Sequence, residues 1–318
     1  MTKIRFGVFL PFYAFEIREK NSSSPLDRVR DIVLECERLG YDSVWLDDHM
    51  MVQKRPILEC WTLLSALSTL TSTIRLGTMV LSSSFRNPAI LAKMAATFDV
   101  ISNGRLELGI GAGVQEDEHR AYGITFPRSS SRINRMKEVV EIIKKMWTEE
   151  KTSYGGKYYK TKDAVCEPKP LQKPHPPITI GGSGEKLTLK VTAQHADRFD
   201  WGYIPSFELY KQKLDVLKRH CKALGRDFRE IEKSCWLGGQ IFIVSNQKEL
   251  DEKILELKQK HVSIEDFKKL NFIVTPHQCK QEIQRYTSLG VTYFMLFFGD
   301  LPNLSSLRLF AERVVEMR

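Results

Sequence analysis

The stretch SPLDRVRDIVLECERLGYDSVWLDDH, residues 24–49, decides the fold. Its first half predicts a helix, because apolar residues recur three or four positions apart. Ser24 suits the N-cap of that helix, Pro25 suits its first position, and Gly40 suits the position where it stops. The run 43–46 then predicts a short buried strand. Strands and helices that alternate in this way are typical of parallel α/β sheets.

The same alternation continues on both sides of this stretch. Seven further strand-like runs are predicted, at residues 4–10, 74–81, 105–110, 178–180, 198–202, 235–244 and 292–298. Eight units in unbroken order predict an α/β fold, a closed (β/α)₈ TIM barrel, in a single domain over residues 1–318. An open doubly wound sheet is the alternative, since it also alternates strand and helix.

The alternation breaks between residues 150 and 176. Residues 154–159 contain two glycines between tyrosines and predict a hairpin. Residues 168–177 contain too many prolines for a helix or a central strand. We therefore expect an insertion at 150–176, between the fourth helix and the fifth strand.

Composition limits the class of protein. Lys and Arg number 48 and Asp and Glu 39, but the excess is spread along helical faces, which argues against a nucleic-acid partner. No apolar run approaches the roughly 20 residues of a membrane span, and the N-terminus lacks a secretory pattern, so we expect a cytoplasmic protein without a membrane partner. The six cysteines form no C-x-x-C pair, so we expect neither a metal site nor disulfides.

An imidazole follows the second strand beside two carboxylates, in the sequence Asp47-Asp48-His49. Active sites of such barrels lie at the carboxyl ends of the strands. A histidine oriented by a carboxylate can act as a general acid or base, so His49 and Asp48 are the candidate catalytic residues. Two alternatives remain open: the carboxylates cap the loop around a partly buried His49, or all three residues serve a metal-dependent hydrolase.

Two glycine-rich turns follow later strands. Residues 109–113, GIGAG, allow a backbone to approach a flat ring or a phosphate, although they lack the complete dinucleotide-binding pattern. Gly181, Gly182 and Ser183 stand at a strand-to-helix junction, where backbone amides and a helix N-terminus can hold a phosphate. A flexible turn is the alternative for the second site.

Taken in order, these motifs resemble the luciferase-like monooxygenase superfamily, and especially its coenzyme F420-dependent oxidoreductases. The resemblance is close over residues 4–205 and looser beyond. The matching stretches are residues 40–49, 75–78, 86–89, 104–113, 118–123, 168–177 and 181–182.

The resemblance implies a homodimeric barrel that holds coenzyme F420, or FMN instead, with the ring at the barrel mouth. Asp48 and His49 would face the ring, with His49 as the acid or base. Thr78 and Met79 would form a bulge with a non-proline cis peptide behind the ring.

The resemblance also assigns the other cofactor contacts. Gly181 and Gly182 would bind the cofactor phosphate, with the Ser183 hydroxyl beside them. The segment from Gly113 to Asp117 would border the ring and the substrate.

Three positions depart from better-known deazaflavin enzymes. No glutamate follows the first strand, Val114 replaces an acidic residue or a tryptophan, and no lysine follows the sixth strand, in residues 201–205. A phosphorylated sugar is therefore not the expected substrate.

The sequence thus predicts an F420-dependent oxidoreductase that transfers a hydride between the deazaflavin and a small, uncharged or weakly polar organic substrate. Apolar walls are expected from Phe12, Tyr13, Trp61 and Trp201. An FMN-dependent luciferase-like monooxygenase and a non-catalytic flavin-binding protein are the alternatives.

Overall fold

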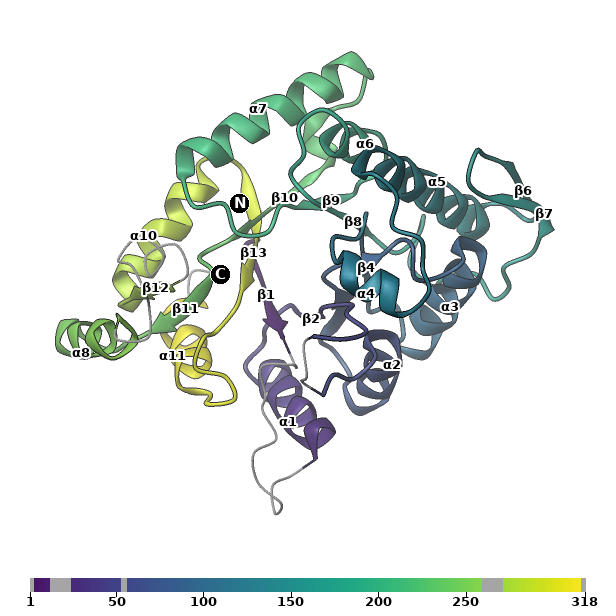
Figure 1. Cartoon of the computed structure of the whole chain (residues 1–318). Coiled ribbons are helices and arrows are strands. Elements are labelled where there is room, and N and C mark those ends of the chain that lie inside the picture. Colours follow the sequence, from purple (N-terminus) through teal and green to yellow (C-terminus); the bar gives the residue numbers. More distant parts are fainter. Residues whose placement is uncertain (1–2, 12–23, 53–55, 259–270, 316–318) are drawn as a thin grey trace.

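Eight parallel strands close into a barrel surrounded by helices (Figure 1). The computed structural model describes residues 3–11, 24–52, 56–258 and 271–315. Pairing of the third strand with the fifth closes the ring, which confirms the TIM barrel and excludes the open sheet. In order around the barrel the strands are β3 (Arg75–Thr78), β2 (Ser43–Leu46), β1 (Arg5–Leu10), β13 (Val291–Leu296), β10 (Glu232–Trp236), β9 (Arg198–Asp200), β8 (Ile178–Gly181) and β5 (Leu106–Gly111).

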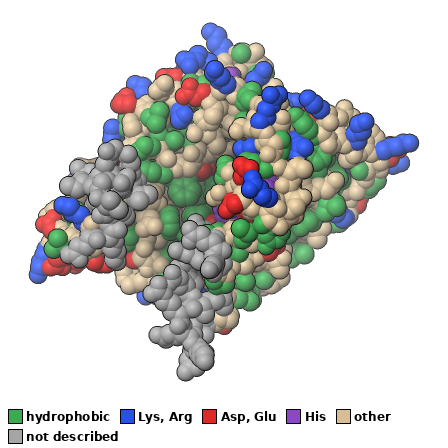
Figure 2. Space-filling model, viewed as in Figure 1, with side chains coloured by type: hydrophobic (Ala, Val, Ile, Leu, Met, Phe, Trp, Pro, Cys, Tyr) green, Lys and Arg blue, Asp and Glu red, His purple; other side chains and the backbone are tan. Residues whose placement is uncertain are grey.

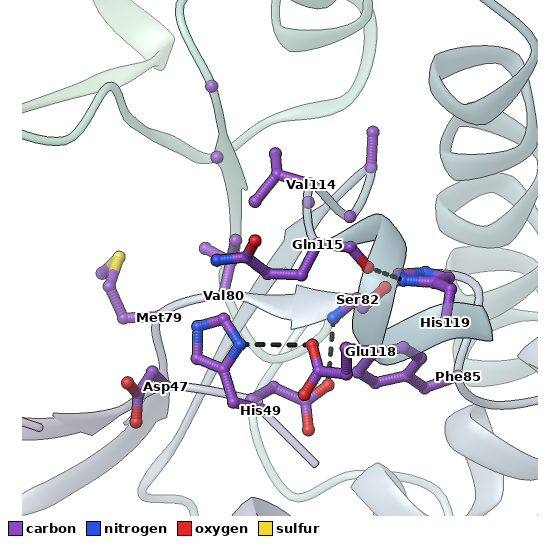
Figure 3. A pocket seen from close by; sticks show the side chains of 16 residues that line it. Asp47, His49, Met79, Val80, Ser82, Phe85, Val114, Gln115, Glu118 and His119 are labelled. Carbon is purple, nitrogen blue, oxygen red and sulfur yellow. Dashed lines mark hydrogen bonds and ion pairs between the residues drawn. The ribbon is translucent and has the colours of Figure 1, made fainter. Parts of the chain in front are cut away.

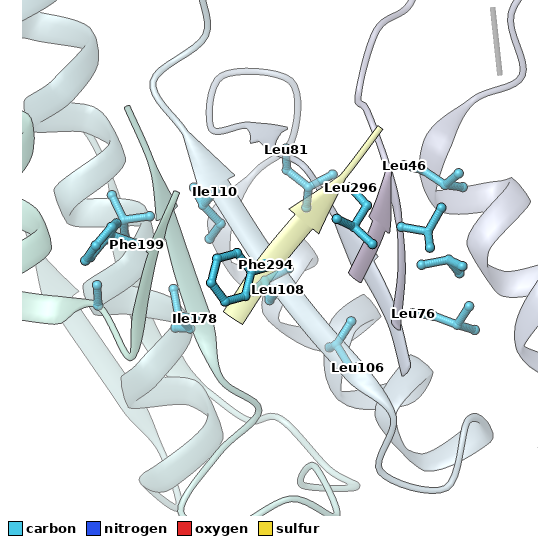
Figure 4. Close-up of a cluster of buried hydrophobic side chains, with 14 of the residues drawn as sticks. Leu46, Leu76, Leu81, Leu106, Leu108, Ile110, Ile178, Phe199, Phe294 and Leu296 are labelled. Atoms are coloured by element: carbon cyan, nitrogen blue, oxygen red, sulfur yellow. The ribbon is translucent and has the colours of Figure 1, made fainter. Parts of the chain in front are cut away.

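The main core lies between the outer faces of the strands and the helices (Figure 4). Capping boxes open two helices, one at Ser24 and one at Thr275, so local sequence fixes where both begin. None of the helices in the described residues is long and apolar enough to span a membrane. The helices are α1 (Pro25–Arg38), α2 (Cys60–Leu70), α3 (Pro88–Ile101), α4 (Glu116–Ala121), α5 (Ser129–Thr148), α6 (Thr188–His195), α7 (Phe207–Ala223), α8 (Gln247–Lys258), α10 (Pro276–Thr287) and α11 (Ser305–Arg313).

Two predicted strands differ from the structure. The run 235–244 is not one strand: β10 ends at Trp236, and β11 (Gln240–Ile243) leaves the barrel to pair with β12 (Asn271–Val274). The strand β12 is not predicted from local sequence, because it is short and is stabilised by a partner about 30 positions earlier. The predicted hairpin is present, as β6 (Thr152–Gly155) and β7 (Lys160–Ala164).

The third predicted strand is interrupted by a bulge. Before the bulge Leu76 is opposite Leu106, and after it Leu81, in β4 (Leu81–Ser82), is opposite Ile110. The offset between partners thus falls from 30 to 29, so β3 and β4 together hold one residue more than β5 in this interval. The extra length lies at Met79 and Val80, whose peptide bond is cis.

Three glycines make room for this bulge. A Cβ at Gly109 would lie 1.9 Å from the Thr78 carbonyl oxygen. A Cβ at Gly111 or Gly181 would lie 2.6 or 2.8 Å from the Val80 side chain. The glycines of β5 and β8 therefore form a recess that the bulge fills.

A buried ionic layer occupies the barrel interior. Arg198 donates to Glu107 at 2.9 Å and to Glu232 at 2.7 Å, and its guanidinium lies 4.0 Å from the Tyr293 ring centre. Burial alone would raise the pKa of Glu107, but Arg198 and Arg75 bring it below its usual value. The contacts of Arg198 thus tie four strands together, and both Arg198 and Glu107 are buried.

We expect Arg198→Met to lower the free energy of unfolding by about 3–5 kcal/mol, because it leaves Glu107 buried without its main counter-charge. Chemical denaturation measures the loss. The control is Arg229→Met, which breaks an exposed pair with Asp227 and should leave stability near the wild-type value. Equal losses in the two variants would contradict a stabilising ionic layer.

We also expect Gly109→Ala to destabilise the protein by about 1–3 kcal/mol, because the new methyl group collides with the backbone of the bulge. The matched control is Gly155→Ala, where a Cβ meets nothing within 4 Å. Thermal unfolding of both variants decides the point: wild-type stability in Gly109→Ala would show that the recess is not tight.

Candidate active site

A cavity opens at the barrel mouth, where the carboxyl ends of several strands meet. The space-filling view shows a hollow there, bordered by acidic side chains (Figure 2). In close-up, Asp47 and Met79 lie at one end, Phe85 and His119 at the other, with His49 between them (Figure 3). The lining residues are Asp47, Asp48, His49, Met79, Val80, Ser82, Phe85, Gly111, Ala112, Gly113, Val114, Gln115, Glu118, His119, Gly181 and Gly182.

Asp48 borders the cavity, but its carboxylate is held by an arginine. Arg86 donates to both oxygens, at 2.8 and 2.9 Å, and the backbone N–H of Ser82 donates at 3.0 Å. Arg86 also contacts Glu59, which caps the start of α2. Asp48 therefore fixes the loop after β2 against β4 and α2, a positioning role.

His49 is oriented by a buried glutamate from α4. Its Nδ1 lies 3.3 Å from Glu118, whose side chain is 3% exposed. Glu118 also accepts hydrogen bonds from the backbone N–H groups of Met50 and Met51. Three contacts from one carboxylate thus fix the backbone and the imidazole of this loop relative to α4.

Asp47 is the carboxylate that faces the barrel axis. Side chains alternate along β2, so Asp47 shares the face of Ser43 and Trp45, which lie inside the barrel. Asp47 is 4% exposed, and its Oδ1 has no hydrogen-bond partner among the described residues. Burial raises its pKa to about 7, although the nearby His49 acts in the opposite direction.

The glycine turn after β8 combines packing with an opening for an anion. Gly181 packs against Val80, so the absence of a side chain at this position makes room for the bulge. Gly182 has a φ of +112°, a region that favours glycine. Lys213 donates to the Ser183 carbonyl at 3.1 Å and brings a positive charge to the turn, where it also lies 3.5 Å from Glu185. No side chain caps the start of α6 at Leu187, but the backbone N–H of Leu189 in the first turn already donates to the Gly184 carbonyl at 2.9 Å.

A second histidine closes the far end of the cavity. Its Nδ1 lies 2.6 Å from the Gln115 carbonyl, which can only accept, so Nδ1 carries the proton. Its Nε2 lies 2.6 Å from the Ser84 hydroxyl. This residue, His119, also packs between Phe85 and Phe126, and it holds α4 against the turn after β4.

Six of the predicted site residues line this one cavity: Asp48, His49, Met79, Gly113, Gly181 and Gly182. Three others do not appear in its lining. Thr78 is buried and exchanges hydrogen bonds with Gly109, Asp117 is exposed on α4, and Ser183 lies beyond the glycine pair. The expected cis peptide follows Met79 rather than Thr78.

Of the expected apolar walls, Trp61 packs against Phe98 and Trp201 stacks on Phe199, and neither lines the cavity. Phe12 and Tyr13 lie outside the described residues. The contact between Glu118 and His49 was not predicted, because only the fold brings α4 to the loop after β2. Strand alternation could have identified Asp47, rather than Asp48, as the inward carboxylate.

Acidic side chains outnumber basic ones among the described residues that line the cavity. Neither Lys nor Arg occurs among its described lining residues, whereas Asp47, Asp48 and Glu118 do. The described part of the chain contains no group of three or more His, Cys, Asp or Glu side chains placed to hold a metal ion.

The residues present fit a flat cofactor with an anionic tail. The bulge at Met79 and Val80 offers a backbone surface for a ring, and Asp47 offers a buried polar atom in need of a partner. The Gly182 turn, with Lys213 beside it, brings a glycine backbone and a positive charge to the place of a phosphate, while the Gly182 N–H itself donates to the Asp200 carbonyl at 2.7 Å.

Residues 4–285 match the luciferase-like monooxygenase family. An F420-dependent glucose-6-phosphate dehydrogenase of Kineococcus radiotolerans is 33% identical over 218 residues, which cover 65% of this chain but only 62% of that relative. Its namesake from Segniliparus rotundus is 29% identical over 317 residues, covering 88% and 90% of the two chains. The solved F420-dependent secondary alcohol dehydrogenase in complex with an F420-acetone adduct has the same fold, with a TM-score of 0.78, 20% identity and 99% of both chains covered. As its motifs predicted, the chain belongs to the luciferase-like monooxygenase family.

Proposed function

We propose that the protein is an F420-dependent oxidoreductase that transfers a hydride between the deazaflavin and a small, uncharged or weakly polar organic substrate. The observation that supports this most is the convergence on one cavity of His49, the bulge at Met79 and Val80, and the turn at Gly181 and Gly182. The names of its F420-dependent relatives add to it. The proposed homodimer and cytoplasmic location rest on the sequence alone.

The chain's own residues have distinct roles in this proposal. The bulge supports one face of the ring, and the Gly182 turn holds the phosphate of the tail. Glu118 orients His49, which moves the proton that accompanies the redox step. When bound, the deazaflavin supplies the two-electron carrier that the side chains lack.

Binding of the two cofactors tests the proposal directly. Purified protein is titrated with F420 and, separately, with FMN, and fluorescence reports binding. We expect F420 to bind more tightly. Tight FMN binding without F420 binding would replace the proposal with the FMN-dependent monooxygenase.

We expect His49→Ala to lower kcat by roughly 10²–10⁴-fold, because it removes the proton-transfer group. Affinity for F420 should stay near the wild-type value. The control is His277→Ala, at an exposed position on α10, which should keep full activity. Unchanged turnover in His49→Ala would show that His49 does not take part in the reaction. If the wild type turned over none of a broad panel of substrates, a flavin-binding protein without catalytic activity would be favoured.

We expect no oxidation of glucose 6-phosphate by the F420-loaded protein. The phosphate dianion would enter a cavity whose described lining carries carboxylates and no Lys or Arg, and like charges repel. The F420 absorbance, followed with glucose 6-phosphate and with secondary alcohols in parallel, provides the measurement. Reduction of F420 by the sugar phosphate would show that cationic groups outside the described lining complete the site.

A further inference from the structure

The carboxyl group of Asp47 differs from the other two carboxyl groups of the cavity in that one of its oxygens, Oδ1, has no hydrogen-bond partner among the described residues. Asp48 is neutralised by Arg86, and Glu118 accepts from two backbone amides and faces His49. Asp47 is equally buried, yet its Oδ1 accepts no hydrogen bond from the described residues. A buried polar atom without a partner is costly unless something else satisfies it.

The position of Asp47 indicates what could satisfy it. Asp47 lies beside Met79 at the inner end of the cavity (Figure 3), on the axis-facing side of β2. A ring resting on the bulge would present its edge to this carboxyl group and would exclude the remaining water. This inference rests on the proposed use of the cavity for a flavin or deazaflavin ring.

We propose that Asp47 keeps its proton when the cavity is filled and donates it as a hydrogen bond to a carbonyl oxygen on the edge of the ring, so that ring binding takes up a proton at alkaline pH. A neutral acid is the only form of this side chain that can donate. The ring edges of flavins and deazaflavins carry carbonyl oxygens that can accept.

The surroundings of Asp47 favour the neutral form. Burial raises its pKa to about 7, and the carboxylates of Asp48 and Glu118 act in the same direction, while His49 opposes them. A further titratable neighbour is the buried thiol of Cys60 on α2, whose pKa burial raises. A ring that excludes more water would raise the pKa of Asp47 further.

The sign of the pH dependence follows from this shift. If the bound state holds the proton more tightly than the free state, the cofactor binds the protonated protein better. Affinity is then constant well below pH 7 and falls as the pH rises through about 7. The fall approaches about tenfold per pH unit, the limit for one proton.

The first measurement uses the protein without any cofactor. Carboxyl ¹³C NMR or infrared difference spectra of wild type against Asp47→Asn report the titration of this one group. We expect it to ionise near neutral pH. Ionisation in the ordinary range of an aspartate would overturn the inference whatever the cofactor.

The second measurement is F420 binding from pH 6 to pH 9, by fluorescence and by calorimetry in buffers of different ionisation enthalpy. We expect Asp47→Asn to bind like the wild type at pH 6, because the amide still donates, and to lose the fall in affinity and the proton uptake at higher pH. Asp47→Ala removes the donor and should weaken binding about two- to tenfold already at pH 6. The titration of F420 itself is common to all variants and cancels in the comparison.

The matched control is Asp42→Asn. Asp42 precedes β2 at the opposite end of the barrel, and it also has a buried oxygen without a hydrogen bond and a pKa raised by burial. It lies outside the cavity, so this variant should follow the wild type. If it loses the pH dependence as Asp47→Asn does, the effect belongs to overall charge and the inference is wrong.

The remaining outcomes separate this inference from the proposed function. F420 binding with the same pH dependence in wild type and Asp47→Asn overturns the inference alone and leaves the proposed function standing. If only FMN binds, the same series is run with FMN, since its ring also carries carbonyl oxygens. Failure of both cofactors to bind the wild type refutes the proposed function and this inference with it.

Discussion

The structure of the mouth depends on the close packing of one bulge against three glycines. Gly109 and Gly111 of β5 and Gly181 of β8 leave a recess without Cβ atoms, and the backbone at Thr78 and the side chain of Val80 fill it. The register between β3 and β5 changes at this point. The surface on which the proposed ring rests is therefore set by steric exclusion inside the sheet, and a single methyl group would disturb it.

Buried charged groups have different surroundings in the barrel interior and at the barrel mouth. Inside the barrel, Arg198 pairs with Glu107 and Glu232, so burial is offset by strong ionic contacts. At the mouth, the Oδ1 atom of Asp47 has no hydrogen-bond partner among the described residues, although His49 lies nearby. The oxygens of Glu107 and Glu232 are occupied by arginines, whereas Oδ1 of Asp47 can still bind a ligand. This contrast is why the mouth, and not the ionic layer, carries the proposed chemistry.

Six of the residues predicted for the site line one cavity, but the prediction did not distinguish the two neighbouring carboxylates of one motif. Asp48 and Asp47 are adjacent, yet the strand directs one outward to Arg86 and the other to the barrel axis. No prediction connected Glu118 with His49, because their contact joins segments 69 positions apart. Trp61 and Trp201 were expected to form cavity walls, but Trp61 packs against Phe98 and Trp201 stacks on Phe199.

What the sequence by itself determined is the order of the βα units, the helix starts at Ser24 and Thr275, and the family, because periodicity, caps and short motifs are local properties. Only the tertiary structure decided that β11 leaves the barrel to pair with β12, that the bulge ends one residue later than expected, and that Glu118 reaches His49. Those outcomes depend on contacts between segments far apart in the chain. Such contacts exist only once the barrel has closed and have no counterpart in local sequence.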